Sequence, residues 1–409
     1  MGNSYTQHYN ELLESLEKKS LRRKLKVSES ASAPLMTIDG RSMLTFCSND
    51  YLGLANHPQI ADAIATGAQR YGSGSGASHM ISGHNQAHDE LEKALAQTQS
   101  SFIPNIKALF FGTGYMANMA AITALSSISD GSNATGSMSI FSEELNHASL
   151  IDGIRLASKQ NHAKIHIYPH QNMDALRKML AEDSNPFKLI VTDGVFSMDG
   201  DIAHVNQLLE LAEEFNTLLM IDDAHGFGVL GDGGLGILNM FGVSASDTRA
   251  SRIIYMGTLG KAAGLSGAFV AGDAELIEWI MQKGRAYIYT TASPPLIAQG
   301  LLKSLELMSD PHHRLNLEKN IAHWHTHLKL KKWHLMPSQT AIQPIVIGSN
   351  ADALKVAQHL DQRNIWVPAI RPPTVPEGTA RLRVTLSATH TADQIDQLIQ
   401  ALHEIEDAF

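Results

Sequence analysis

The sequence has almost no cysteine. Cys47 is the only one among 409 residues, so no disulfide can form within the chain and nothing indicates secretion. No apolar run is long enough to cross a bilayer, and the N-terminus has no apolar signal core. Basic residues are fewer than acidic residues, and the resulting net charge of −9 argues against a nucleic-acid-binding protein. We therefore expect a cytoplasmic protein that binds neither nucleic acid nor membrane.

The organisation of the chain indicates an α/β protein with more than one domain. Residues 5–26 predict an amphipathic helix that ends in a basic cluster, and residues 35–46 predict a hairpin that turns at Asp39-Gly40. Seven short and mostly apolar runs then alternate with helical stretches: 108–111, 139–141, 164–168, 189–192, 218–221, 253–255 and 268–271. Such alternation predicts a mostly parallel seven-stranded sheet with helices on both faces.

The predicted domain boundaries follow from the same reading. We expect an N-terminal segment at 1–58, a large domain at 59–295 and a smaller C-terminal α+β domain at 296–409, with the break at Pro294-Pro295. In the small domain, strands are predicted at 341–347, 365–370 and 380–387, and helices at 351–364 and 391–408. Ligands of parallel sheets bind at the carboxyl ends of the strands, so the residues that follow the seven runs are the candidates for function.

Two of these strand ends carry reactive side chains. Asp222, Asp223 and His225 follow the run at 218–221, where a buried carboxylate needs a cationic partner such as a protonated pyridine nitrogen. Taken alone, the same string could be an ion pair or a helix cap. Lys261 follows the run at 253–255, and burial would lower its pKa toward the neutral amine that a Schiff base requires. Taken alone, it could be an exposed loop lysine.

Other strings are weaker signals. Gly112-Thr-Gly114-Tyr115 leads from a strand into a helical pattern and could bind phosphate through free amides, or be a simple tight turn. The glycine pattern at 231–236 matches a dinucleotide motif but does not open a helix after a strand, so we predict a loop. His323, His325 and His327 have metal-like spacing but lack a catalytic carboxylate, and we predict surface residues and no metal site.

Together these segments resemble the α-oxoamine synthases, which are fold-type I enzymes that depend on pyridoxal phosphate (PLP). The resemblance covers about residues 20 to 405 and rests on five strings in a fixed order: 48–54, 144–150, 194–200, 222–226 and 258–261. The sequence from Ile370 to Arg383 is similar to the branch of this family in biotin biosynthesis. The resemblance implies PLP as cofactor and the fold-type I transferase architecture.

The resemblance also implies roles for individual residues. Lys261 would bind PLP covalently, Asp222 would pair with the pyridine nitrogen, His225 would approach the ring hydroxyl, and His147 would stack on the ring. Ser197 would line the ring pocket. The phosphate would contact three residues: Gly114, Tyr115 and Thr258. Arg383 would bind the carboxylate of the amino acid. The acyl substrate would contact three more: Arg22, Asn49 and Thr374.

The implied reaction is the decarboxylative condensation of L-alanine with a pimeloyl thioester, carried by coenzyme A or by an acyl carrier protein. The implied assembly is a homodimer with shared active sites, because residues 289–295 resemble the segment that reaches the phosphate of the neighbouring subunit. Sister enzymes remain alternatives, above all one that joins glycine to acetyl-CoA. So do enzymes that use succinyl or palmitoyl thioesters, an aminotransferase, and a binding protein without catalysis.

The chain departs from the family pattern at three places. Asp193 stands where glutamate is usual, and Phe227 replaces a small residue after His225-Gly226. Residues 129–139 look like an insertion. None of these changes removes a catalytic group, but the first two bear on the shape of the pocket.

Overall fold

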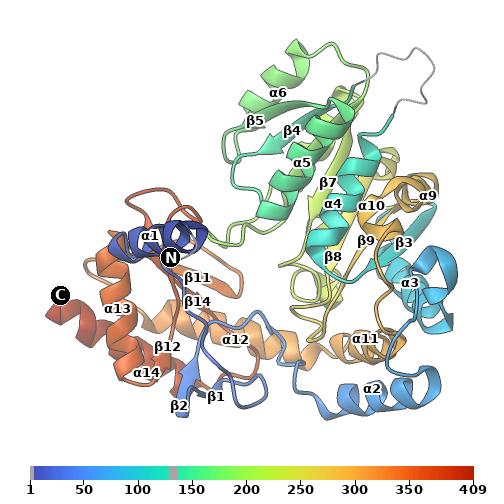
Figure 1. The fold of residues 1–409 in the computed structure, drawn as a ribbon. Coiled ribbons are helices and arrows are strands. Elements are labelled where there is room, and N and C mark those ends of the chain that lie inside the picture. The colour runs from blue at the N-terminus through green and yellow to red at the C-terminus, as the bar shows by residue number, and fades with distance from the viewer. Residues whose placement is uncertain (1–3, 129–136) are drawn as a thin grey trace. The chain divides into compact units, whose positions relative to one another are not determined.

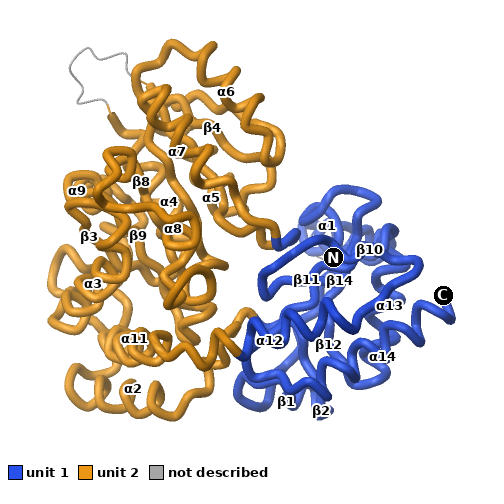
Figure 2. The backbone as a smooth tube through the Cα atoms, turned by 180° about the vertical axis from the view of Figure 1, so that it is seen from behind, with its two compact units in different colours: residues 1–48, 198–200, 316–409 blue, residues 49–197, 201–315 orange. Residues whose placement is uncertain are grey.

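Two compact units make up the chain (Figure 2). The computed structural model describes residues 4–128 and 137–409, so residues 129–136 of the expected insertion lie outside it. Unit 1 consists of Met1–Ser48, Met198–Gly200 and Asn316–Phe409, and unit 2 of Asn49–Ser197 and Asp201–Leu315. These boundaries differ from the expected 58/59 and 295/296. One reason is that helix α11 (Pro295–Met308) packs along α2 (Pro58–Tyr71) and so stays with unit 2.

A seven-stranded sheet forms the centre of unit 2 (Figure 1). Its strands are β3 (Ile106–Phe111), β4 (Ser139–Glu143), β5 (Lys164–Tyr168), β6 (Lys188–Asp193), β7 (Leu218–Asp222), β8 (Ile253–Thr258) and β9 (Ala268–Asp273). Each contains one of the seven predicted runs. The order is β3-β9-β8-β7-β6-β4-β5, and only β9 is antiparallel to its neighbours within this sheet. The prediction of a mostly parallel sheet is therefore confirmed.

Helices pack on both faces of this sheet. On one face, three helices bury alanine, leucine and isoleucine side chains against alternate strand residues such as Leu109 and Phe111, namely α4 (Gly114–Leu125), α5 (Ala148–Asn161) and α9 (Ala274–Lys283). Phe110 points to the opposite face, because side chains alternate along a strand, and there it stacks near His88 of α3. The helices of unit 2 after α2 are α3 (Gln86–Gln99), α4 (Gly114–Leu125), α5 (Ala148–Asn161), α6 (Met173–Glu182), α7 (Val205–Glu214), α8 (Ile237–Met240), α9 (Ala274–Lys283), α10 (Arg285–Ile288) and α11.

Unit 1 joins the two ends of the sequence in one sheet. The predicted hairpin is present as β1 (Leu35–Ile38) and β2 (Arg41–Thr45), and β12 (Ile365–Trp366) pairs with β2 in parallel. The strand predicted at 365–370 is divided, because Pro368 follows β12 and the next strand, β13 (Ala369–Ile370), belongs to another sheet. That sheet has the order β10-β11-β14-β13, with β10 (His334–Leu335), β11 (Ile342–Gly348) and β14 (Ala380–Thr385).

The helices of unit 1 differ from expectation at one end. Helices α13 (Asn350–Gln362) and α14 (Ala392–Ala408) lie where they were predicted. Helix α12 (Pro311–His327) begins in unit 2, before unit 1 resumes at Asn316. The first helix, α1 (Ser4–Lys18), ends well before residue 26, so this prediction was wrong in its extent. Ser20 adopts a positive φ of 55° and the amide of Leu21 closes on the carbonyl of Leu16, which terminates the helix before the basic cluster.

Within the described residues, none of the helices has the length and apolar character needed to span a membrane. The glycine pattern at 231–236 forms a loop with one short 3₁₀ turn at Asp232–Gly234, as predicted.

Candidate active site

A cavity of about 190 Å³ opens in unit 2 at the carboxyl ends of the sheet strands. It is lined by the start of α4 and by the segments that end or follow β4, β6, β7 and β8. All eight residues for which the family resemblance implies contact with the cofactor line this cavity: Gly114, Tyr115, His147, Ser197, Asp222, His225, Thr258 and Lys261. The sheet thus brings together residues that are up to 147 positions apart, counted from Gly114 to Lys261.

Lys261 lies at one end of a chain of polar contacts. Its Nζ atom is 2.7 Å from Nε2 of His225, and Nδ1 of His225 is 2.5 Å from the hydroxyl oxygen of Tyr51. The Tyr51 hydroxyl also lies 3.3 Å from Oδ1 of Asn49. Tyr51 is fully buried, so its position is set by packing, and it orients His225 against the lysine amine. The sequence analysis did not identify Tyr51.

Asp222 lies at the centre of a second chain. Its Oδ2 atom accepts a hydrogen bond from Nδ2 of Asn118 at 2.7 Å, and its Oδ1 atom accepts the amide of Ala224 at 3.0 Å. The same Asn118 nitrogen donates to Oγ of Ser149 at 2.8 Å, and that oxygen lies 2.7 Å from Nδ1 of His147. A continuous network of buried side chains, Asp222, Asn118 and Ser149, therefore leads to the more exposed ring of His147.

The two adjacent carboxylates serve different purposes. Asp223 does not line the cavity, and its Oδ2 atom accepts hydrogen bonds from the amide of Ile237 at 2.8 Å and from the hydroxyl of Tyr255 at 2.7 Å. Burial raises the pKa of Asp223 to about 7. A Cβ atom at position 226 would lie 2.0 Å from its Oδ1 atom, which explains the glycine after His225. Asp222 is thus the functional candidate, whereas Asp223 stabilises the segment after β7 through its hydrogen bonds to Ile237 and Tyr255.

Asp193, noted in the sequence as a departure from the family pattern, lines the cavity itself. Its Oδ2 atom accepts the amide of His147 at 2.9 Å. Burial, and next the negative charge of Asp222, raise the pKa of Asp193 well above its usual value. Burial also lowers the pKa of His147, so its ring is favoured in the neutral form. Of the other departures, Phe227 packs edge-on against Phe269 with ring centres 5.1 Å apart and does not line the cavity.

The N-terminus of α4 supplies the remaining wall. Thr113 caps the helix through Oγ1, which accepts the amide of Met116 at 3.2 Å. A Cβ atom at Gly114 would lie 3.5 Å from the side chain of Met256 and 3.8 Å from Oγ1 of Thr258, so glycine leaves this side of the cavity open. The free amides of a helix start attract anions such as phosphate. The phenol of Tyr115 donates to Asp152 at the rim.

The residues predicted to bind substrates are distributed over both units. Asn49 belongs to unit 2 and contacts Tyr51, but it does not line the cavity. Arg22, Thr374 and Arg383 belong to unit 1. Arg383 is buried on β14 and donates from Nη1 to Oγ1 of Thr385 at 3.1 Å, whereas Arg22 and Thr374 are exposed. Their roles in substrate binding stay predictions.

Two polar residues of the cavity were not identified as functional candidates in the sequence, namely Asn118 and Ser149. Helical spacing could have found Asn118, because it lies four residues after Gly114 and residues at this spacing share a helix face. Ser149 lies two residues after His147, within the first turn of α5. Its contact with Asn118 depends on the packing of α5 against α4, which sequence spacing alone does not reveal.

Comparisons with known proteins identify the family of the chain. Residues 41–402 match the family model described as aminotransferase class I and II. The 8-amino-7-oxononanoate synthase of Janthinobacterium sp. (strain Marseille) is 53% identical over 397 residues, which are 96% of each chain. The enzyme of the same name from Bordetella petrii is 50% identical with the same coverage.

Solved structures show the same fold. A serine palmitoyltransferase from S. paucimobilis, with bound PLP and myriocin, superposes with a TM-score of 0.87 at 26% identity, covering 99% of this chain and 98% of that chain. An 8-amino-7-oxononanoate synthase from Francisella tularensis superposes with a TM-score of 0.72 at 30% identity, covering 90% and 99%. The chain belongs to the class I and II aminotransferase family and, within it, to the group of the 8-amino-7-oxononanoate synthases.

Proposed function

We propose that this chain condenses L-alanine with a pimeloyl thioester to give 8-amino-7-oxononanoate, carbon dioxide and a free thiol, as a step of biotin biosynthesis. The observation that carries the proposal is a single cavity in which Lys261, His225, His147 and Asp222 meet. The identity of about 50% with named 8-amino-7-oxononanoate synthases, over nearly the whole length, supports the substrate pair.

PLP is the proposed cofactor, and the side chains of the cavity fit its chemistry. Lys261 offers the amine that an aldehyde requires, next to His225. An ionised carboxylate can accept about four hydrogen bonds, and the described residues supply two to Asp222, which leaves room for the N–H of a pyridine ring. The start of α4 faces the same cavity and would receive the phosphate. When bound, PLP supplies an electron sink for the negative charge that develops at Cα of the amino acid.

Lys261 is proposed to hold the cofactor and to move the Cα proton. Nζ of Lys261 lies 2.7 Å from Nε2 of His225, and Nδ1 of His225 lies 2.5 Å from the hydroxyl oxygen of Tyr51. These contacts fix Nζ in the cavity before the amino acid enters. A positioned amine can then serve as base and, later, as acid in the same turnover.

Asp222 and His147 are proposed to set the charge around the cofactor. Burial and the negative charge of Asp222 raise the pKa of Asp193, which favours the protonated form of Asp193. Asp222 therefore stabilises a proton on the pyridine nitrogen. His147 is favoured as a neutral ring, which can stack on a flat cofactor without adding a second positive charge.

The substrates are proposed to bind through residues assigned by resemblance. Arg383 would bind the carboxylate of alanine through its planar guanidinium. Arg22, Asn49 and Thr374 would contact the acyl chain, whose distal carboxyl or ester requires a polar partner. A pocket that admits a methyl group excludes glycine only weakly, since one methyl is worth about 1–3 kcal/mol of discrimination.

The experiment that tests this function is a matrix of substrates. Alanine, glycine and serine are each supplied with pimeloyl, acetyl, succinyl and palmitoyl thioesters, on coenzyme A and, for pimeloyl, also on a carrier protein. Thiol release and carbon dioxide are measured. The proposal expects the highest kcat/KM for alanine with a pimeloyl thioester. A higher value for glycine with acetyl-CoA, or for serine with palmitoyl-CoA, would assign the chain to a sister activity.

A homodimer with shared active sites is also proposed. Tyr289, in the segment expected to reach the neighbouring subunit, is 71% exposed, and Ile81 is 80% exposed. The proposed interface with a second subunit would bury these two side chains. Light scattering during size exclusion should give twice the mass of the chain. A monomer with full activity at micromolar concentration would contradict the proposal.

A further inference from the structure

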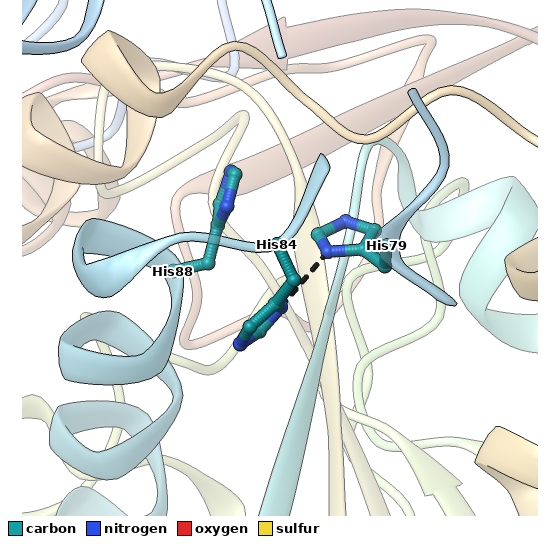
Figure 3. Close-up of side chains that lie close together, drawn as sticks. All are labelled: His79, His84 and His88. Carbon is teal, nitrogen blue, oxygen red and sulfur yellow. Dashed lines mark hydrogen bonds between the residues drawn. The ribbon is translucent and has the colours of Figure 1, made fainter. Parts of the chain in front are cut away.

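Three histidines gather in unit 2 outside the proposed active site (Figure 3). His79 begins a single π-helical turn (His79–Gly83), His84 follows that turn, and His88 lies in the first turn of α3. One ring nitrogen from each lies within 4.8 Å of the others. Nδ1 of His79 and Nδ1 of His84 are 3.0 Å apart. None of the three lines the active-site cavity.

The backbone of the π-helical turn is tightly packed, and this packing brings the histidine rings together. A Cβ atom at Gly83 would lie 2.1 Å from the carbonyl oxygen of Ala77, so the turn requires glycine at this position. The ring of His79 is stacked on Tyr287, with centres 4.9 Å apart and an angle of 11°. The three ring positions are therefore held by the fold and do not depend on long flexible side chains.

The three rings are favoured in the neutral form, which is the form that ligates metals. Burial, and next the charges of His88 and His84, lower the pKa of His79 to about 3. Burial also lowers the pKa values of His84 and His88. A neutral imidazole has one nitrogen with a free lone pair and one N–H. The hydrogen bond made by one ring nitrogen determines which of the two nitrogens carries the hydrogen.

The outer partners of the rings point to Nδ1 as the ligating atom. Nε2–H of His88 donates to the carbonyl oxygen of Ser293 at 2.8 Å, and Nε2 of His84 lies 4.0 Å from Oε2 of Glu92. A carbonyl or carboxylate behind the distal N–H is the usual support of a metal-binding histidine, because it fixes the ring and raises its basicity. Nδ1 of His88 now accepts the amide of Asn85 at 3.2 Å, and a metal would replace this contact.

We propose that His79, His84 and His88 bind one divalent transition-metal ion, with Zn²⁺ as the best fit, and that water completes a tetrahedral shell. Three imidazoles and one water suit Zn²⁺, and imidazole also binds Co²⁺ and Ni²⁺. On binding, the hydrogen that His79 and His84 share between their Nδ1 atoms moves to an Nε2 atom. The ion would fasten the turn at 79–83 to the first turn of α3. The sequence analysis predicted no metal site, since it weighed only the histidines at 323–327.

The test uses the untagged protein as purified, after dialysis against EDTA and without free PLP. Titration calorimetry with ZnCl₂ should show one ion per chain, and saturating Zn²⁺ should raise the melting temperature. Absorption of the Co²⁺-loaded protein should show the intense visible bands of a tetrahedral site. Absence of stoichiometric binding, or the weak spectrum of octahedral Co²⁺, would overturn the proposal.

Variants locate the ion. His84→Ala should fold normally because His84 is exposed, and it should lose at least tenfold in Zn²⁺ affinity, as should His79→Ala. Glu92→Gln should weaken binding by about 10- to 100-fold through the outer contact to His84. Melting temperatures in EDTA verify that each variant is folded. Unchanged Zn²⁺ affinity in folded His84→Ala would contradict the assignment.

The chain offers a matched control for these variants. His323 and His327 lie four residues apart on α12 with stacked rings, 4.1 Å between centres, so they form a second histidine pair that could bind a metal. The double variant His323→Ala/His327→Ala should keep the Zn²⁺ affinity and stoichiometry of the unmodified protein. Loss of the ion in this variant would place the site on α12 and refute the proposed cluster.

Discussion

The side-chain nitrogen of Asn118 lies 2.7 Å from Oδ2 of Asp222, in a buried part of the cavity wall. The same nitrogen donates to Ser149, which contacts His147. Asn118 therefore fixes the carboxylate proposed to pair with the pyridine nitrogen and, through Ser149, the ring proposed to stack on the cofactor. These hydrogen bonds explain why a polar side chain is buried on α4 among alanine and isoleucine side chains.

Replacement of Asn118 by alanine should slow catalysis more than it alters binding of the cofactor. A buried partner left without its hydrogen bond costs roughly 1–3 kcal/mol, which corresponds to about 5- to 160-fold in rate. Steady-state kinetics measure this effect. Asn161→Ala is the matched control, because Asn161 makes two similar hydrogen bonds to Thr123 and Ser126 outside the cavity lining. It should lower the melting temperature and leave kcat within about twofold.

Asp222→Asn and Asp223→Asn should have contrasting effects. Asp222→Asn should retain PLP but lose more than about tenfold in kcat, or 1.4 kcal/mol of barrier, because an amide does not stabilise a proton on the pyridine nitrogen. Asp223→Asn should mainly lower the melting temperature, since Asp223 holds Tyr255 and Ile237. Equal turnover in Asp222→Asn and the unmodified enzyme would show that the charge is supplied elsewhere.

Arg383→Lys should raise KM for alanine with a smaller effect on the acyl substrate. Lysine keeps the charge but loses the two parallel hydrogen bonds of guanidinium, and hydrogen bonds to charged groups are worth about 1.5–3 kcal/mol. The expected loss in kcat/KM for alanine is thus roughly 10- to 160-fold. Arg381→Lys is the control, because Arg381 pairs with Asp199 at 2.6 Å as a structural contact. If both variants lost alanine affinity alike, Arg383 would not be the specific ligand.

The stability of unit 2 should depend on His170 in a defined range of pH. Burial acts to lower the pKa of His170, but the hydrogen bonds that its ring donates to Asp201 and Glu143 outweigh it and raise the pKa to about 10 from the usual 6.5. The charged ring therefore stabilises the folded chain fully below pH 6.5, and this contribution is lost as the pH rises toward 10. Urea unfolding of His170→Gln should show a deficit that is largest near pH 6 and shrinks by pH 10. A deficit that grows with pH would contradict this assignment.

The sheet could be predicted from the sequence because its strands are short runs of buried apolar residues, such as Leu189–Val191. Such runs are recognised without knowing which strands pair with each other. Lys261, Asp222 and His225 could be found because each follows such a run. The length of α1 could not, since no residue of that helix is buried and its end depends on the local backbone of Ser20. The unit boundaries could not, because they depend on the packing of α11 along α2.

Tyr51 and Asn118 were missed because their contacts come from elements distant in sequence. Asn118 and Asp222 are 104 positions apart, and Tyr51 and His225 are 174 apart. His79 and His84 are close in sequence, yet their rings meet only because the π-helical turn positions them. The sequence pattern of one segment does not show which side chains come into contact in the folded chain.

The most direct test of the proposed active site is reduction of the PLP-loaded protein with borohydride, followed by peptide mapping. The purified protein should be yellow, and reduction should fix one PLP to the peptide that contains Lys261 and to no other. Lys261→Ala should abolish the label, whereas Lys303→Ala, at a partly exposed helical lysine that pairs with Glu306, should not. A label on another lysine, or a protein that takes up no PLP, would contradict the account.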